Sequence, residues 1–184
     1  MGVKTVDIPP TVLFRATSLE YYPKGLSPAG SRMASGRFNA HGVSAVYLAF
    51  DYDTALAEYY GSDPARPVVL LPVIVAAKDV IEITPNLGNW PLVWRDWDCD
   101  WKLARDQVAA GVPHVTCSSW ECGADALRRE CSGIIFPSQR PQGGKNLVIF
   151  TEDTALGKVQ MTVQDPHEEI IKANPAKGRR GKPR

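Results

Sequence analysis

Short apolar runs separated by loops rich in proline and glycine are the feature that most limits how this chain can fold. The longest run, Val68–Ala77, is far shorter than the roughly 18 apolar residues that a membrane-spanning helix needs. Most runs have the length of one strand, and helical segments do not alternate with them in a regular βαβ pattern. The sequence therefore predicts a compact single domain of the α+β class, in which small mixed sheets are flanked by helices.

Two strands and a long loop are predicted near the start of the chain. A double proline precedes a β-rich stretch, so we expect a strand that starts at Val12 and has Arg15 near its end. Thr17–His41 has no sustained periodicity and contains Pro, Gly and Ser throughout, which predicts a loop with a short helical turn. Ala45–Phe50 has the pattern of a buried strand.

A helix and a strand with an internal proline are expected next. The residues of Asp51–Tyr60 favour a helix, and either Asp51 or Asp53 can cap it. The apolar strand Val68–Ala76 is interrupted by Pro72. Because proline cannot donate a hydrogen bond to a neighbouring strand, this pattern predicts an edge or a bulge.

The second half of the chain contains one clear helix signal and several strands. Ser118 and Glu121 have the spacing of a capping box, which predicts the start of a helix that runs to about Cys131. The remaining predicted elements are strands over Gly133–Phe136, Asn146–Phe150 and Lys158–Val163, and a weak helix over Pro166–Ala173.

Four tryptophans lie close together between these halves. Trp90, Trp94, Trp97 and Trp101 have helical spacing, which predicts one stripe of indoles on a helix that begins at about Pro91. Large aromatic side chains usually belong to a core, so we favour a satellite core. A stacking platform for a base or a partner is the alternative.

Charge and cysteine content narrow the function classes. The net charge of +1 gives no sign of a polyanionic partner, because much of the basic character lies in the last eight residues, which we expect to be disordered. The first ten residues have no apolar leader, so we expect a cytoplasmic protein. Four cysteines lack a C-x-x-C pair and are interpreted as small buried residues, with a zinc site as the less favoured alternative: Cys99, Cys117, Cys122 and Cys131.

Four groups of residues have side chains suited to binding phosphate or ribose. They are Phe14–Ala16, Gly36–Asn39, Tyr47 with Glu58, and Phe136–Ser138 with Gly144–Asn146. Together with a Val-Tyr-Leu-Ala strand and a Thr-Ala-Leu-Ala-Glu helix start, their order and spacing resemble the RES family of bacterial toxins. That family is named for a conserved Arg, Glu and Ser, and the resemblance covers most of positions 12–150.

The resemblance implies a fold like that of ADP-ribosyltransferase toxins, with an NAD-binding cleft. It implies a catalytic domain over residues 11–164, between an N-terminal extension over 1–10 and a C-terminal segment over 165–184. It also implies a toxin–antitoxin system in which an antitoxin, usually of the Xre type, covers the cleft. Nucleic acid is then contacted only through the antitoxin, and no membrane is involved.

Glu58 is the strongest catalytic candidate for such a reaction. Nicotinamide in NAD is cationic and leaves as a neutral molecule, so cleavage of its bond to ribose needs no general acid and no metal. A carboxylate can stabilise the oxocarbenium-like ribose, while Arg15 and Arg37 can bind the diphosphate or the ribose hydroxyls with forked donors. A solvated helix glutamate and surface arginines are the alternative interpretations.

Three further residues complete the predicted site. Tyr47 can lay its ring against nicotinamide and orient a hydroxyl, or it can be a core tyrosine. Ser138 and Asn146 flank a Gly-rich loop and can position ribose or an acceptor, or can simply form a turn and a strand start. The predicted catalytic residues are Glu58, Arg37, Tyr47 and Ser138, and the predicted NAD-binding residues are Arg15, Arg37, Tyr47 and Asn146.

Three functions remain open from the sequence. The first is a toxin that consumes NAD with water or phosphate as the acceptor, and the second transfers ADP-ribose to a protein. The third is a binding module that uses the Trp cluster and the basic tail without catalysis. Phe38 stands where related chains often have Trp, and the Trp-rich insertion over Trp90–Trp101 leaves the acceptor undecided.

Overall fold

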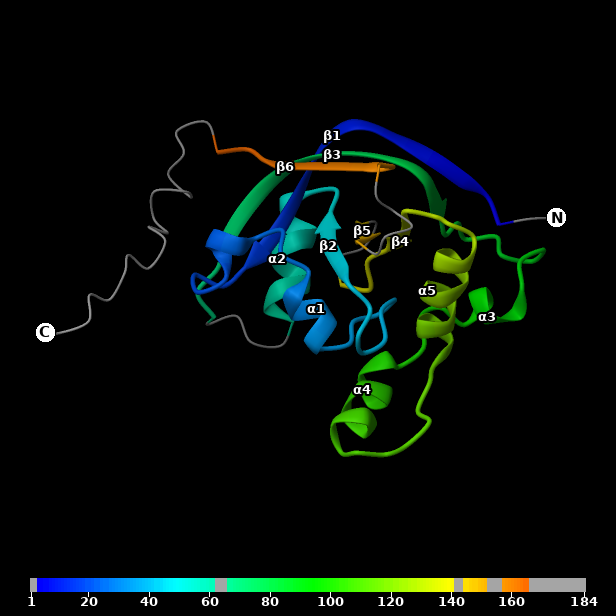
Figure 1. Ribbon diagram of the computed structural model, residues 1–184. Coiled ribbons are helices and arrows are strands. Elements are labelled where there is room, and N and C mark those ends of the chain that lie inside the picture. Colours follow the sequence, from blue (N-terminus) through cyan, green and yellow to red (C-terminus); the bar gives the residue numbers. More distant parts are fainter. Residues whose placement is uncertain (1–2, 62–65, 141–143, 152–156, 166–184) are drawn as a thin grey trace, which may run out of the picture.

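One six-stranded sheet organises the part of the chain that this computed structural model describes, residues 3–61, 66–140, 144–151 and 157–165 (Figure 1). The strands are β1 Thr5–Thr17, β2 Ala45–Ala49, β3 Val69–Glu82, β4 Gly133–Pro137, β5 Lys145–Phe150 and β6 Val159–Val163. The helices are η1 Tyr22–Lys24, α1 Ala29–Met33, α2 Tyr52–Tyr60, α3 Leu92–Arg95, α4 Trp101–Ala109 and α5 Ser118–Arg128. The predicted α+β class is confirmed.

The strand pairings close into a ring. The order is β1-β2-β5-β4-β3-β6, and β1 also pairs with β3. β1 and β3 form a long antiparallel ribbon that arches over the three short strands (Figure 1). Between the short strands, β2–β5 and β5–β4 are antiparallel, whereas β4 runs parallel to β3. The ring therefore holds β5 between β2 and β4.

Alternation along the short strands creates two hydrophobic cores. On β5, Leu147 and Ile149 belong to the core that faces the ribbon, while Val148 and Phe150 belong to a second core. Successive strand residues point to opposite faces, so one apolar run supplies both cores. The second core includes residues of α3 and α5, which cover that face of the short strands.

The first strand begins earlier than the sequence predicted. β1 starts at Thr5 and not at Val12, and it pairs with β3 through residues that we expected to form an extension. Its pairing shifts register between Ile8 and Thr11, where Pro9 and Pro10 lie. An irregularity of this kind accommodates residues that cannot donate a ladder hydrogen bond, so the two prolines bend the strand without ending it.

The presence of Pro72 predicted an edge or a bulge, and an edge position is wrong for this strand. β3 is an interior strand, with β1 on one side and β6 and β4 on the other. The β6 ladder begins at Val73, and Pro72 accepts a hydrogen bond from the Gln164 N–H at 2.8 Å but cannot return one. Pro72 therefore ends the β6 ladder inside a central strand.

The predicted helices α2 and α5 both form and α5 begins at Ser118 as predicted, but the two predicted caps have different outcomes. Asp51 is the N-cap of α2, and its side chain accepts a hydrogen bond from the Thr54 N–H at 2.7 Å, as expected. The capping box of α5 is wrong, because Cys117 is the N-cap and the Ser118 hydroxyl donates to Asp96 Oδ2 at 2.7 Å. Ser118 thus ties α5 to the loop after α3.

The four indoles do not form one helical stripe. α3 ends at Arg95 and α4 begins at Trp101, so the tryptophans have separate environments. Trp90 and Trp97 pack against the second core, Trp94 is fully buried in it and donates to Asp125 Oδ2 at 2.9 Å, and Trp101 lines a cavity. The satellite core is therefore formed by Trp90, Trp94 and Trp97.

All four cysteines are free thiols. Cys122 and Cys131 are buried, and Cys99 and Cys117 are half-buried. Among the described residues, no group of three or more His, Cys, Asp or Glu side chains is arranged to hold a metal ion. No helix of the described chain is long and apolar enough to cross a membrane. The weak helix over 166–173 and the basic tail lie outside the described residues.

Candidate functional site

A cavity of about 610 Å³ brings most of the predicted site residues together. Its volume is in the range of small-molecule sites, roughly 300–1,000 Å³. Residues from β1, β2, β5, α2, the 36–37 turn and the start of α4 line it. The predicted residues in its wall are Arg15, Arg37, Tyr47, Glu58 and Asn146.

Arg15 reaches the cavity from β1, where it pairs with Leu71 of β3. Its Nη1 atom is buried and has no hydrogen-bond partner among the described residues. Burial lowers the pKa of Arg15, because desolvation disfavours its charged form. A buried guanidinium nitrogen without a partner is costly, so its position favours an anionic ligand.

Arg37 has a second unpartnered nitrogen in the same cavity wall. Its Nη1 atom is buried without a partner among the described residues, while Nη2 donates to Gln139 Oε1. Desolvation by burial lowers the pKa of Arg37, and the charge of Glu58 is the largest opposing influence. Arg37 and Glu58 are therefore close enough for their opposite charges to interact.

A hydrogen-bond network holds the turn that carries Arg37. The Tyr47 hydroxyl donates to Asn39 Oδ1 at 2.8 Å and accepts from the Phe38 N–H at 2.9 Å. Asn39 is fully buried and donates to the carbonyl of Ser31 at 2.8 Å. A Cβ at Gly36 would lie 2.7 Å from the Tyr47 hydroxyl oxygen, so this close approach requires glycine. The Tyr47 hydroxyl thus positions the turn, while its ring lines the cavity.

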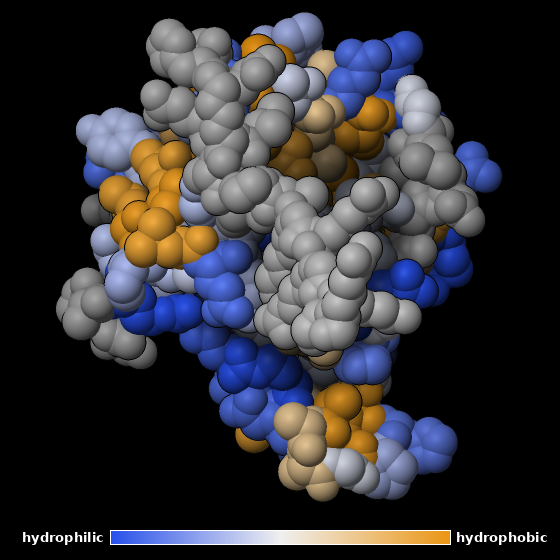
Figure 2. Space-filling model, turned by 60° about the vertical axis from the view of Figure 1, so that its left-hand side comes forward, coloured by the Kyte–Doolittle hydropathy of each residue, from blue (hydrophilic) through white to orange (hydrophobic). Residues whose placement is uncertain are grey.

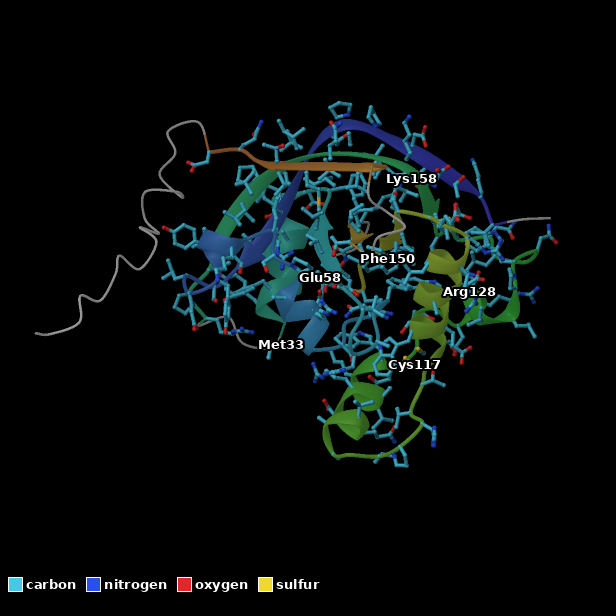
Figure 3. All side chains as sticks on the ribbon, viewed as in Figure 1. Met33, Glu58, Cys117, Arg128, Phe150 and Lys158 are labelled. Carbon is cyan, nitrogen blue, oxygen red and sulfur yellow. The ribbon has the colours of Figure 1, made fainter. Side chains whose placement is uncertain are left out.

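Glu58 extends from α2 (Figure 3), and two hydrogen bonds hold its carboxylate. The Ser138 hydroxyl donates to its Oε1 at 2.7 Å, and Asn146 Nδ2 donates to the same atom at 2.8 Å. Oε2 accepts no hydrogen bond from the described residues. The carboxylate therefore has a fixed orientation and one oxygen available to a ligand. Ser138 does not line the cavity, and it contacts the site through Glu58.

Aromatic rings and charged side chains complete the wall. Phe14, Tyr59 and Trp101 offer flat apolar surfaces of the kind that stack on bases and nicotinamide. Asp98 and Lys102 add charges of both signs near the start of α4. The cavity therefore combines cationic donors, one oriented carboxylate and several ring faces.

Sequence reasoning missed two residues that contact Arg37. Gln139 accepts a hydrogen bond from its guanidinium, and the ring centroid of Trp97 lies 5.6 Å from Arg37 Cζ. Trp97 belonged to the predicted stripe of indoles, but no local pattern connects it with Arg37. Gln139 lies in a loop that has no periodic signal and is 102 residues away from Arg37. Only the folded chain brings these groups together.

Comparisons with known proteins identify a family and a related fold. The RES domain family matches residues 12–171. Among solved structures, the chain is similar to a chain in the crystal structure of the M. tuberculosis MbcT–MbcA toxin–antitoxin complex. The two are 17% identical with a TM-score of 0.52, and the match covers 91% of this chain and 90% of that chain. No curated protein matches the sequence.

Proposed function

Because the chain belongs to the RES domain family, as its motifs predicted, we propose that it is the toxin of a bacterial toxin–antitoxin system and that its substrate is NAD. In the proposed reaction, the bond between nicotinamide and ribose is cleaved, with water or inorganic phosphate as the acceptor. The proposed catalytic unit is the predicted domain over residues 11–164 together with Thr5–Pro10, which the structure adds to β1. The fold shared with a chain of a toxin–antitoxin complex supports the toxin assignment.

One observation carries the proposal. Arg15 and Arg37, which line one cavity, each have a buried guanidinium nitrogen without a partner among the described residues, and the same wall holds a carboxylate fixed by two hydrogen bonds. NAD has the matching charge pattern, since its diphosphate is anionic and its ribose becomes cationic as nicotinamide leaves. Arg15 and Arg37 bind the diphosphate, and Glu58 faces the ribose.

The chemical step needs only charge stabilisation and positioning. The bond between ribose C1′ and the nicotinamide nitrogen breaks, and its electron pair stays with nicotinamide, which leaves neutral. The positive charge that develops on the ribose is stabilised by the carboxylate of Glu58. Water then attacks C1′ and releases a proton, or phosphate attacks and forms a sugar phosphate.

The remaining predicted residues orient these groups. Ser138 and Asn146 fix the Glu58 carboxylate, so the two oxygens of Glu58 differ in their hydrogen bonding. Tyr47 offers its ring to the substrate and uses its hydroxyl to hold the turn that bears Arg37. The aromatic residues of the wall stack on nicotinamide and adenine.

An antitoxin is the proposed partner. An antitoxin of the Xre type covers the cavity, prevents NAD from entering, and supplies any contact with DNA. The toxin acts in the cytoplasm, where its substrate is found. Co-expression with the neighbouring gene tests this partner, because a cognate antitoxin restores growth and co-purifies with the toxin.

Nicotinamide release from NAD tests the reaction. We expect Glu58→Gln to reduce the rate by about two to three orders of magnitude, as loss of a group that stabilises transition-state charge does. Glu121→Gln is the matched control, because Glu121 is an exposed glutamate on α5, away from the cavity wall, and its variant keeps the wild-type rate. Assays with and without phosphate identify the acceptor.

Other outcomes distinguish the alternative functions. If nicotinamide release requires cell lysate and a protein acquires labelled ADP-ribose, the chain is an ADP-ribosyltransferase. If no nicotinamide forms and toxicity survives both Arg37→Ala and Glu58→Gln, the enzyme assignment is wrong and a binding module remains.

A further inference from the structure

Arg37 is held in place by neutral groups. Its Nη2 atom donates to the amide oxygen of Gln139, and its guanidinium lies over the ring of Trp97 with Cζ 5.6 Å from the centroid. Among the described residues, Arg37 forms no ion pair, whereas Arg105, Arg128 and Arg129 each pair with an aspartate. The positive charge of Arg37 is therefore fixed in position without being neutralised.

The two groups that hold Arg37 are themselves fixed. Gln139 Nε2 donates to the carbonyl of Asp98 at 3.3 Å, which turns the amide oxygen of Gln139 toward Arg37. Trp97 stacks on Phe38 at 6.1 Å and meets Phe136 edge-on at 6.1 Å. Two segments that are distant in the sequence from Arg37, and from each other, thus converge on its guanidinium.

The neutral contacts leave the charge of Arg37 without an ion pair, because the nearby carboxylates form no salt bridge with it. Glu58 and Asp98 both oppose the effect of burial on the pKa of Arg37, but neither forms a salt bridge with it. A carboxylate at position 139 would accept from Nη2 and form a strong charge-assisted pair. Such a pair would compete with an anionic ligand for the same charge.

We propose that Gln139 and Trp97 are positioning residues, which present the uncompensated charge of Arg37 to the diphosphate of the substrate. The inference rests on the proposed function and adds two residues to its site. Gln139 supplies an acceptor of the right geometry without a charge. Trp97 supports the guanidinium plane through a cation–π contact, which is stronger in a partly desolvated site.

Binding of ADP tests the role of Gln139 directly, because ADP carries a diphosphate and needs no cleavage. Gln139→Glu has nearly the same shape and replaces an exposed side chain, so we expect it to fold. We expect its Kd for ADP, measured by calorimetry, to rise about tenfold or more, as the loss of one charge-assisted hydrogen bond does. Gln160→Glu adds the same charge at an exposed position of β6, outside the cavity wall, and leaves the Kd unchanged.

Steady-state kinetics test the positioning role of Trp97. Trp97→Leu removes the ring face and raises KM for NAD by about tenfold while kcat changes by no more than about threefold. Trp97→Phe restores a ring and recovers most of the wild-type KM. Circular dichroism melting curves verify that both variants fold, since Trp97 also packs against the second core.

The outcomes separate this inference from the proposed reaction. If Arg37→Ala weakens ADP binding but Gln139→Glu and Trp97→Leu do not, the positioning role is wrong. If neither Arg37→Ala nor Gln139→Glu affects ADP binding, the diphosphate site itself is wrong and both proposals fail. If ADP binding responds as expected but no nicotinamide is released, the positioning role stands and the proposed reaction is overturned.

Discussion

The hydroxyl of Tyr47 shows how one atom can control the placement of a charged residue. It donates to Asn39 and accepts from the Phe38 N–H, so it joins β2 to the turn that carries Arg37. Burial raises the pKa of Tyr47 well above its usual value, because the phenolate would be desolvated. The hydroxyl therefore keeps its proton, and its donation to Asn39, above the pH at which an exposed tyrosine ionises.

This pKa shift predicts how stability depends on pH. We expect Tyr47→Phe to lower the free energy of unfolding by about 1–3 kcal/mol at neutral pH, since the variant leaves the Phe38 N–H unpaired. Above about pH 10, Tyr47 ionises in the unfolded chain but not in the folded one, so the folded state holds more protons and wild-type stability falls by up to about 1.4 kcal/mol per pH unit. Tyr47→Phe has no hydroxyl at this position, so its free energy of unfolding lacks this decrease with pH.

Urea unfolding of both proteins between about pH 8 and pH 11 provides the measurement. The difference in the free energy of unfolding between the wild type and Tyr47→Phe is expected to become smaller as pH rises. The buried cysteines with raised pKa values contribute equally to both proteins and cancel in the comparison. A difference that stays constant over the alkaline range would contradict the prediction.

Single residues were also the scale at which the sequence was most informative about the site. Arg15, Arg37 and Glu58 could be nominated because each lies in a recognisable local motif. Gln139 could not, since its role depends on a contact across 102 residues and on a neighbouring carbonyl that orients its amide.

α5 lies outside the cavity wall but contacts the turn that carries Arg37. Gly123 packs directly on the backbone of Phe38, and a Cβ at this position would overlap with the Phe38 carbonyl. Three residues earlier, Trp120 Nε1 donates to the carbonyl of Gly36 at 2.8 Å. One face of α5 therefore supports the Arg37 turn from behind, and the position of that helix is tied to the geometry of the cavity.

Gly123→Ala tests this support. We expect the variant to lose about 1–3 kcal/mol of stability, because the methyl group must displace backbone. We also expect a higher KM for NAD, because the displaced turn carries Arg37. Gly30→Ala is the matched control, since a Cβ at Gly30 meets nothing within 4 Å and alanine favours the helix. Thermal melting and nicotinamide release measure the two effects, and an unchanged KM in a destabilised Gly123→Ala would refute the link to the site.

Elements with strong local signals were predictable, and those decided by distant contacts were not. Asp51 caps α2 as its sequence context indicates, because capping involves residues three positions apart. By contrast, Pro9 and Pro10 look like the end of a strand, yet pairing with β3 carries β1 through them. The spacing of Trp94 and Trp97 suggested one helix. In the structure α3 ends at Arg95, before Trp97, and Trp97 stacks on the distant Phe38.

At the scale of the whole molecule, the ring of strands determines where ligand charges can be placed. Arg15 comes from the long ribbon, Arg37 from the turn over the second core, and Glu58 from α2.

The lobe that contains α4 projects from this body (Figure 1), and apolar residues lie on its surface (Figure 2). Leu103 and Val112 are exposed there, while the neighbouring Trp101 and Lys102 line the cavity.

Ligand binding is expected to stabilise the whole molecule. Among the described residues, one guanidinium nitrogen of Arg15 and one of Arg37 are buried without a partner, and both side chains line the cavity proposed to receive the diphosphate. At about 100 times its Kd, ADP adds about 2.7 kcal/mol to the free energy of unfolding, which raises Tm by about 5 to 10 °C for a chain of this size. Differential scanning fluorimetry measures the shift.

The controls for this shift depend on charge. Adenosine lacks the diphosphate and is expected to produce little change, and Arg15→Ala is expected to abolish most of the shift caused by ADP. Rising salt concentration should reduce the ADP effect only in part, because buried charges are screened less than exposed ones. An equal shift with adenosine and ADP would place the binding energy in the base and not in the diphosphate.

The position of β5 has a consequence for protein synthesis. The ribosome delivers Arg15, Arg37 and Glu58 early, but Ser138 and Asn146, which orient the Glu58 carboxylate, are translated much later. Until β5 inserts between β2 and β4, the growing chain has an open sheet and an unanchored acid. Under the proposed function, a nascent polypeptide therefore has no oriented acid until β5 has been made and inserted.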